Sequence, residues 1–432
     1  MRLGLPIAAG RLGIVAMGVV DTVAVGQLAP RDLAAQSLGW VINGPALIGG
    51  LGLLLGVQIL TARAAGSGNE GTALAIWKRG LVVGVVAGVL VCAIVWGVGP
   101  RLLGGLGVPG GLAARGARVA AVLTLSIPFH LVFMASAKML EALEQPVPGA
   151  VAMWIANAVN LALNLALTPS CGAVGSAWAT VLSRLALAIG MAAFVVAAPS
   201  LRRFRGGESP VEGYGPLLRI GVAAALSGLT EAAAFASMSV IAARSGGATA
   251  VAVWSIATGG LVTLVFLLAQ GLSTAGVVLV SEAVGAGDAR AARETGWLSI
   301  GLTVAAMSAC GVASALLAPW VVTLFTTDPA VRASLAAVMG FVALLMVSDG
   351  GQGATDAILR ARGDNIFPTA VRMIAYALVA PMVALILAGG LRTAAVFVAI
   401  LAASWGAWLP MLTRLAIRDL SASRSHERTL TA

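Results

Sequence analysis

Charged residues are scarce in this chain of 432 residues: Asp, Glu, Lys and Arg make up only 10% of it, whereas 59% is hydrophobic. A soluble domain carries about 25% charged residues. The composition therefore excludes a soluble enzyme or binding domain, and the mean hydropathy of +0.98 agrees. We expect an all-α membrane protein that crosses the bilayer many times.

Several motifs of known chemistry are absent. There is no Gly-x-x-x-x-Gly-Lys-[Ser/Thr], so nothing indicates an ATP-driven pump, and there is no His-Glu-x-x-His or Gly-x-Ser-x-Gly. Gly285-Ala286-Gly287-Asp288 matches a short string of intramembrane aspartyl proteases, but it lies beyond the end of a predicted span. The cysteines are few, odd in number and scattered, which excludes a disulfide framework: Cys92, Cys171 and Cys310. We expect no enzyme activity and no cofactor.

Apolar runs separated by short Gly, Pro and charged clusters fill the chain. The first run is too long for the hydrophobic region of a signal peptide and contains Asp21, so it reads as a spanning helix. We expect twelve spans, at about 3–28, 38–62, 80–99, 117–140, 147–168, 172–198, 217–243, 248–280, 296–325, 332–359, 366–388 and 391–417.

In a membrane protein, a net charge of +10 first indicates how the chain is oriented in the bilayer, before it suggests a nucleic-acid partner. Lys and Arg are roughly twice as frequent in one alternating set of loops, a set in which we place Arg360 and Arg362. By the positive-inside rule these loops and both termini are cytoplasmic, and the protein is predicted to lie in the inner (cytoplasmic) membrane.

The two halves of the chain look alike. Gly66-Ser67-Gly68-Asn69 matches Gly285-Ala286-Gly287-Asp288 at an offset of 219, and residues 144–148 match 364–368 at an offset of 220. Six spans per half give parallel repeats, with a substrate site near mid-membrane. The predicted parts are an N-terminal lobe, a linker, a C-terminal lobe and a cytoplasmic tail, at 1–198, 199–216, 217–418 and 419–432.

Polar residues inside the N-terminal spans suggest one pocket. Asn157, Asn160 and Asn164 share one face of a helix, and three amides facing lipid would be costly. We expect this face to meet Asp21, which lies within the first span. The alternative is that the amides only bond to neighbouring helices, at about 0.6 kcal/mol each.

A second group of polar residues lies in the C-terminal spans. Glu231 sits in the middle of the run 217–243, and Asp349, Gln352 and Asp356 share one helix face. Several carboxylates in a low dielectric cannot all stay ionised, so protons or a bound cation must neutralise some of them. If an ion and a cationic substrate exclude each other in two conformations, antiport results. The alternative for Glu231 is a protonated acid that only packs helices.

These residues also lie in motifs that resemble a known family. The matching stretches, in chain order, are Gly18-Val19-Val20-Asp21-Thr22-Val23-Ala24-Val25-Gly26, Gly66-Ser67-Gly68-Asn69, Asn160-x-x-x-Asn164, Gly172-Ala173-Val174-Gly175-Ser176-Ala177-Trp178-Ala179-Thr180, Glu231 with Phe235, Asp349-x-x-Gln352, and Leu359-Arg360-Ala361-Arg362-Gly363-Asp364. Across nearly its whole length the chain resembles a NorM-like or DinF-like bacterial member of the multidrug and toxic compound extrusion (MATE) family.

The resemblance implies two six-helix lobes that form a V around a central cleft. It implies a monomer that exports amphipathic organic cations in exchange for H⁺ or Na⁺ by alternating access, with membrane lipids as its surroundings. Asp21 matches the acid of the N-terminal lobe, with Asn160 and Thr180 as its polar partners. Glu231 and Asp349 match the C-terminal acids and are the candidate Na⁺ ligands.

Some residues depart from the family pattern. Asn164 stands where the family often has a second acid, Leu345 stands where a Tyr is frequent, and Asp356 is an additional acid. The coupling ion stays open, with H⁺ slightly favoured, and the substrate is not specified. The competing function is a flippase for a lipid-linked or polar anionic precursor, which would require a basic site, for example at Arg184.

Overall fold

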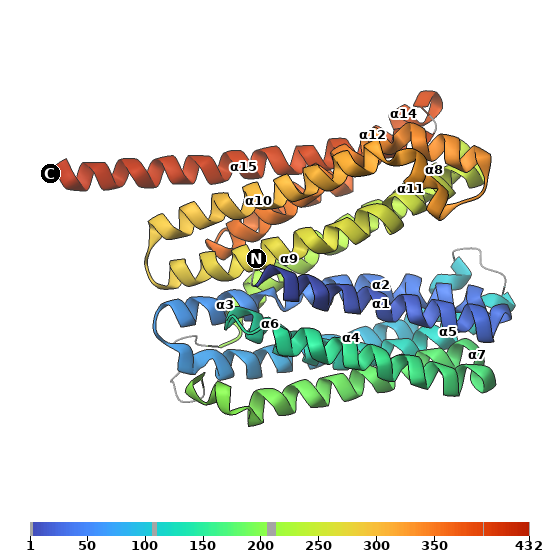
Figure 1. Ribbon diagram of the computed structural model, residues 1–432, viewed down its shortest axis with the longest axis horizontal. Helices are drawn as coiled ribbons and strands as arrows, with labels where there is room; N and C mark the ends of the chain where they lie inside the picture. Colours follow the sequence, from blue (N-terminus) through green and yellow to red (C-terminus); the bar gives the residue numbers. More distant parts are fainter. Residues whose placement is uncertain (1–2, 106–109, 205–212, 392, 432) are drawn as a thin grey trace. The chain divides into compact units, whose positions relative to one another are not determined.

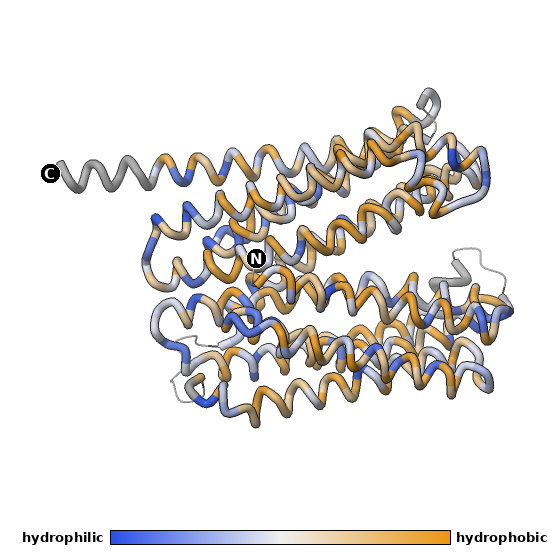
Figure 2. The backbone as a smooth tube through the Cα atoms, in the orientation of Figure 1, coloured by the Kyte–Doolittle hydropathy of each residue, from blue (hydrophilic) through white to orange (hydrophobic). Residues whose placement is uncertain are grey.

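The computed structural model describes residues 3–105, 110–204, 213–391 and 393–431. This described part consists of helices and short turns and contains no strand (Figure 1), which confirms the all-α class. Within it, ten helical segments are long and apolar enough to cross a membrane. Figure 2 shows hydrophobic residues along the helices and hydrophilic residues gathered at the turns that join them. The chain is a membrane protein with many spans.

Two of the ten segments are long enough for two crossings, with 51 and 71 residues. The segment Val147–Ala197 contains Gly172, and the segment Gly215–Gly285 contains Gly247, and both glycines have non-helical backbone angles. These glycines lie where the sequence predicts a boundary between two spans. The total of twelve spans stays a prediction.

The chain divides into two compact units, which we call the N-unit (Ala9–Ala225) and the C-unit (Met1–Ala8 with Leu226–Ala432). The predicted bounds of lobes and linker remain predictions, and linker residues 205–212 lie outside the described part. The helices up to the start of the C-unit are α1 (Gly4–Leu28), η1 (Pro30–Asp32), α2 (Leu33–Leu53), α3 (Leu55–Gly66), η2 (Glu70–Thr72), α4 (Ala73–Gly105), α5 (Gly110–Thr124), α6 (Ser126–Ala142), α7 (Val147–Ala197), η3 (Pro199–Phe204) and α8 (Gly215–Trp254).

The C-unit continues from α8. Two of its elements are short π-helical segments, which are rare and typical of functional sites. The elements are the π-helix η4 (Ser255–Val262), α9 (Thr263–Gly285), α10 (Ala289–Leu316), α11 (Ala318–Phe325), α12 (Pro329–Ala361), α13 (Ile366–Ile374), the π-helix η5 (Ala375–Val379), α14 (Ala380–Leu391) and α15 (Thr393–Thr431).

Helix α12 is the centre of the C-unit. It packs against α9, α10 and α15, three long helices that Figure 1 shows running alongside it. Because neighbours cover several of its faces, the polar residues Asp349, Gln352 and Asp356 of α12 are buried in protein. In the N-unit, α6 packs against both α4 and α7, and α2 packs against α5.

The turns preserve the internal repeat. Gly68 and Gly287 have φ angles of +77° and +75°, which only glycine adopts easily. In both turns the residue after the glycine donates its N–H to the carbonyl five residues earlier, at 2.9 Å. This bond satisfies an orphan carbonyl at the end of the preceding helix, as in a Schellman motif.

A second pair of turns follows the same rule. Glu144 and Gly363 have φ angles of +58° and +89°, and the next residue donates to the carbonyl five residues earlier, at 2.8 and 2.9 Å. These positions are 219 residues apart, the offset of the first pair. The expected offset of 220 is therefore corrected to 219, because the turn geometry and not the prolines sets the register.

A buried group of charges ties three helices of the N-unit together. Glu141 on α6 accepts from Arg11 Nη2 on α1, at 3.1 Å, and from Gln58 Nε2 on α3, also at 3.1 Å. Lys138 donates to Gln58 at 2.8 Å and lies 3.6 Å from the Glu141 carboxylate. One carboxylate therefore compensates two buried cations.

We predict that Glu141→Gln destabilises the protein, because Arg11 and Lys138 then lose their shared counterion. Breaking a buried ion pair costs about 3 kcal/mol or more, which the thermal unfolding temperature of the purified protein will report. Glu294→Gln is the matched control, since Glu294 pairs with Arg290 at an exposed position, and it should leave that temperature unchanged. Equal unfolding temperatures for both variants would show that the buried group does not stabilise the fold.

Candidate functional site

The N-unit encloses Asp21 of α1 in a shell of neutral hydrogen-bond donors. Asn160 and Asn164 of α7 donate to Oδ1 at 3.0 and 2.9 Å, and the Thr180 hydroxyl donates to Oδ2 at 2.5 Å. All four side chains have no exposed surface. The predicted meeting of Asp21 with the asparagine face, and with Thr180, is thus what the structure shows.

The shell depends on a reversal of the chain inside α7. Asn160 and Thr180 are 20 residues apart, yet the Asn160 amide lies 3.4 Å from the Thr180 hydroxyl. Gly172 lies between them with a φ angle of +58°, and a Cβ there would meet the Asp32 carboxylate. Glycine at this position lets the two arms of α7 approach Asp21 from two directions.

Asn157 is not part of this shell. Its amide donates to the Gly13 carbonyl of α1 and to the Met153 carbonyl, both at 2.9 Å. It joins two helices, which is the alternative stated for these amides. Arg184 is buried, donates to the Ser126 hydroxyl at 2.9 Å and lies over the Trp40 ring at 5.9 Å.

We predict that Gly172→Ala lowers stability and disturbs the Asp21 shell together. An L residue at positive φ costs about 1–2 kcal/mol, and the new methyl group would also press on Asp32. Gly190→Ala on the same helix is the control, because nothing lies within 4 Å of its Cβ position. Unfolding temperatures should fall for the first variant only, and a fall of the same size in both would contradict the role of Gly172.

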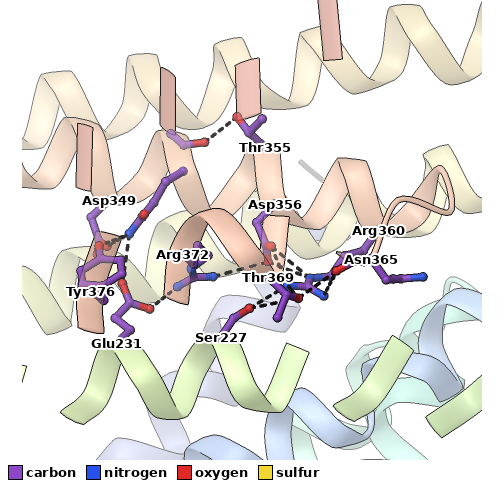
Figure 3. A network of polar contacts seen from close by, with 12 residues as sticks. Ser227, Glu231, Asp349, Thr355, Asp356, Arg360, Asn365, Thr369, Arg372 and Tyr376 are labelled. Atoms are coloured by element: carbon purple, nitrogen blue, oxygen red, sulfur yellow. Dashed lines mark hydrogen bonds and ion pairs between the residues drawn. The ribbon is translucent and has the colours of Figure 1, made fainter. Parts of the chain in front are cut away.

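The C-unit gathers Glu231, Asp349 and Tyr376 around one amide (Figure 3). Gln352 Nε2 lies 3.0 Å from Glu231 Oε1, 3.0 Å from Asp349 Oδ1 and 2.5 Å from the Tyr376 hydroxyl. Three elements supply these oxygens, namely α8, α12 and the π-helix η5. The predicted approach of Glu231 to the polar face of α12 is correct, and Tyr376 joins it.

Arg372 of α13 links this group to Asp356. One guanidinium nitrogen bonds Glu231 Oε2, and the other lies 3.4 Å from Asp356 Oδ2. Figure 3 shows Arg372 between the two acids. Arg360 holds the far side of Asp356, with its Nε 3.0 and 3.1 Å from the two carboxylate oxygens.

Charges in this network do not cancel. The three carboxylates of Glu231, Asp349 and Asp356 face the two guanidinium groups of Arg360 and Arg372, which leaves one negative charge if all are ionised. Asp349 makes no ion pair with any described residue, and only 6% of it is exposed. It is the carboxylate that still requires a neutralising partner.

Aromatic rings adjoin the same group. Phe235 lies one helical turn after Glu231, and its ring centroid is 6.5 Å from that of Tyr376 and 5.7 Å from that of Trp254. Trp254 in turn packs edge-on against Phe397 at 5.2 Å. Acidic and aromatic side chains side by side suit an amphipathic organic cation, because the ring faces attract positive charge.

Nitrogen donors surround the Glu231 carboxylate, one of the two candidate Na⁺ ligands. Both oxygens of Glu231 accept from nitrogen donors, one from Gln352 and one from Arg372. Among the described residues, no three His, Cys, Asp or Glu side chains are grouped to hold a metal. Na⁺ binding by Glu231 and Asp349 stays a prediction.

Comparison with known sequences places the chain among transporters. Residues 6–166 and 223–386 match the family described as MatE. The chain belongs to the MatE family. The two matched ranges together cover more than half of the chain, and their starts lie 217 residues apart, in agreement with the internal repeat.

A relative and two solved structures are similar to this MatE chain over most of its length. The probable multidrug resistance protein NorM of Caulobacter vibrioides is 34% identical over 88% of this chain and 82% of its own length. The eukaryotic MATE transporter AtDTX14 has a TM-score of 0.87 and 18% identity over 96% of this chain and 94% of its own. An outward-facing multidrug resistance MATE family transporter has a TM-score of 0.87 and 20% identity over 98% of this chain and 96% of its own. These structures show a shared fold.

Sequence reasoning missed three side chains of the MatE site. Arg360 was expected in a cytoplasmic loop, which is wrong, because it is fully buried and bonds Asp356. Arg372 lies in a predicted span, where an arginine is expected to pair with an acid, and this signal was available. Tyr376 supplies a hydroxyl, the group that Leu345 lacks, but from a different helix.

Proposed function

We propose that this chain is a secondary active antiporter that exports amphipathic organic cations in exchange for H⁺ or Na⁺. The observation that carries the proposal is the uncompensated carboxylate of Asp349 in the C-unit, beside Glu231 and an aromatic cluster. The family supports export, because its NorM relative is named a multidrug resistance protein. No other group of buried acids in the described C-unit adjoins so many rings.

Exchange follows from the need for one positive charge. A coupling ion or a cationic substrate can each neutralise the C-unit network, but both together would overcompensate it. Two conformations that expose the network to opposite sides would then carry them in opposite directions. A membrane potential contributes about 2.3 kcal/mol per charge per 100 mV. Asp21 of the N-unit is a second buried acid, and we assign it a part in the same cycle.

Alternating access requires two lobes that move against each other around the site. We propose twelve spans in two parallel six-helix lobes that form a V around a central cleft, with both termini cytoplasmic in the inner membrane. The working form is a monomer among lipids, with no cofactor other than the exchanged ion and no nucleic-acid partner. It is a transporter and not an enzyme, as the family indicates.

A flippase for an anionic precursor is not favoured. Such a site needs buried basic groups free to bind the anion. Arg360 and Arg372 are instead paired with carboxylates, and Arg184 bonds Ser126 and lies over Trp40. The buried charges of the C-unit are mixed rather than mostly acidic, yet their sum is negative, which suits a cation.

We predict that Asp349→Asn and Glu231→Gln each lower efflux of ethidium, a planar aromatic cation, by about tenfold or more, which equals about 1.4 kcal/mol. Each change removes a charge that the ion and the dye would share. Dye efflux from cells that contain equal amounts of membrane-inserted protein measures it. Glu294→Gln, an exposed acid, should transport like the parent protein. Undiminished efflux in both site variants would refute the assignment.

We predict that Asp21→Asn also reduces ethidium efflux while the protein still inserts and folds. Asparagine keeps the size of the side chain, but one carboxylate oxygen becomes a nitrogen. That nitrogen cannot accept a hydrogen bond, so either the bond from Thr180 or the bonds from Asn160 and Asn164 are lost. Thr22→Val on the same helix is the control, because the Thr22 hydroxyl bonds only its own helix at Gly18. If Asp21→Asn exported ethidium as well as Thr22→Val does, the assigned role of Asp21 in transport would be wrong.

A further inference from the structure

The Glu231 carboxylate is already bonded to a cation of the protein itself. Arg372 bonds Oε2, and Gln352 Nε2 lies 3.0 Å from Oε1. The side chain of Glu231 is 21% exposed and that of Arg372 is 10% exposed. The guanidinium therefore occupies the position next to Glu231 that a bound metal cation would need.

Of the two acids that Arg372 contacts, only Glu231 depends on it for an ion pair. Asp356 has a closer basic partner, since Arg360 Nη2 lies 2.8 Å from Asp356 Oδ1. Arg360 itself donates to Ser227 at 2.9 Å and to Thr369 at 3.0 Å. If Arg372 is replaced by a neutral residue, Asp356 therefore keeps its ion pair with Arg360, whereas Glu231 loses its ion pair.

Gln352 is a different kind of neighbour. It is neutral, and its Oε1 is buried without a hydrogen-bond partner in the described part of the chain. A rotation of the amide would turn this oxygen toward an incoming cation. Oxygen atoms are the ligands that hard cations such as Na⁺ prefer. Gln352 therefore does not exclude such an ion, whereas the permanent charge of Arg372 does.

We propose that Arg372 decides the coupling ion: it is a tethered cation that excludes Na⁺ from the Glu231–Asp349 site. The inference rests on the proposed antiport and refines it. With Arg372 in place the network lacks one positive charge, and the remaining candidate for exchange is H⁺. Without Arg372 the network lacks two positive charges, and oxygens of Glu231, Asp349, Tyr376 and Gln352 become available to a metal ion.

The test measures Na⁺ binding by thermal unfolding of the purified, full-length protein. Unfolding temperatures are compared in NaCl and in KCl at equal ionic strength, so that only ion identity differs. The parent protein should give the same temperature in both salts. Arg372→Gln should unfold at a higher temperature in NaCl, by about 2 °C at a Na⁺ concentration about tenfold above Kd, and the shift should saturate.

Four further variants complete the design. Arg372→Lys keeps the tethered charge and should show no Na⁺ shift, and the exposed Arg290→Gln should behave like the parent protein. Arg372→Gln combined with Glu231→Gln should lose the gained shift, because one carboxylate ligand is gone. Arg372→Ser removes the same charge with a smaller side chain and takes the place of Arg372→Gln if the latter does not fold.

Two results would overturn the proposal. One is a Na⁺-specific shift in the parent protein, which needs no variant to be informative. The other is a folded Arg372→Gln or Arg372→Ser that stays indifferent to Na⁺. This assay reports ion binding and not export. If the parent protein exported no dye, that result would contradict the proposed antiporter, but the role of Arg372 would still be decided by the two results above.

Discussion

Carboxylates inside an apolar helix bundle must find their partners within the protein, since neither lipid nor bulk water will supply them. Nearly every polar feature of this chain follows from that constraint. It explains why α12, which packs against α9, α10 and α15, carries the buried residues Asp349, Gln352, Asp356 and Arg360. A helix surrounded by other helices is where such residues can be tolerated.

The Asp21 shell and the C-unit network meet the constraint in different ways. In the N-unit, neutral amides and a hydroxyl surround Asp21, so its charge is stabilised by dipoles and not cancelled. In the C-unit, arginines pair directly with Glu231 and Asp356 and leave Asp349 with an amide partner. A charge held by dipoles and a network short of one positive charge both respond to an arriving cation, which is why we assign exchange to these places.

The sequence alone was sufficient for the helical class, the membrane location, the repeat and the Asp21 shell. Long apolar runs predict the first two, repeated turn residues predict the third, and an asparagine stripe predicts part of the fourth, whereas Thr180 was implied by the family resemblance. Asn157 shows the limit, because it shares the stripe with Asn160 but lies beside Gly13, away from the acid. Arg360 was misplaced because it lies next to the Gly363 turn, and only the packing of α12 reveals its burial. The pairing of Arg372 with Glu231 joins residues 141 positions apart, which no spacing rule predicts.

The central claim is that one buried negative charge accepts either a proton or a cationic substrate, and not both. Proton release on substrate binding tests it most directly. Ethidium would be added to the purified protein in a weakly buffered solution without Na⁺, and the change in pH recorded with a dye. The account predicts release of about one proton for each ethidium bound, and none from a folded Asp349→Asn variant. Saturating ethidium binding with no proton released from the parent protein would contradict it.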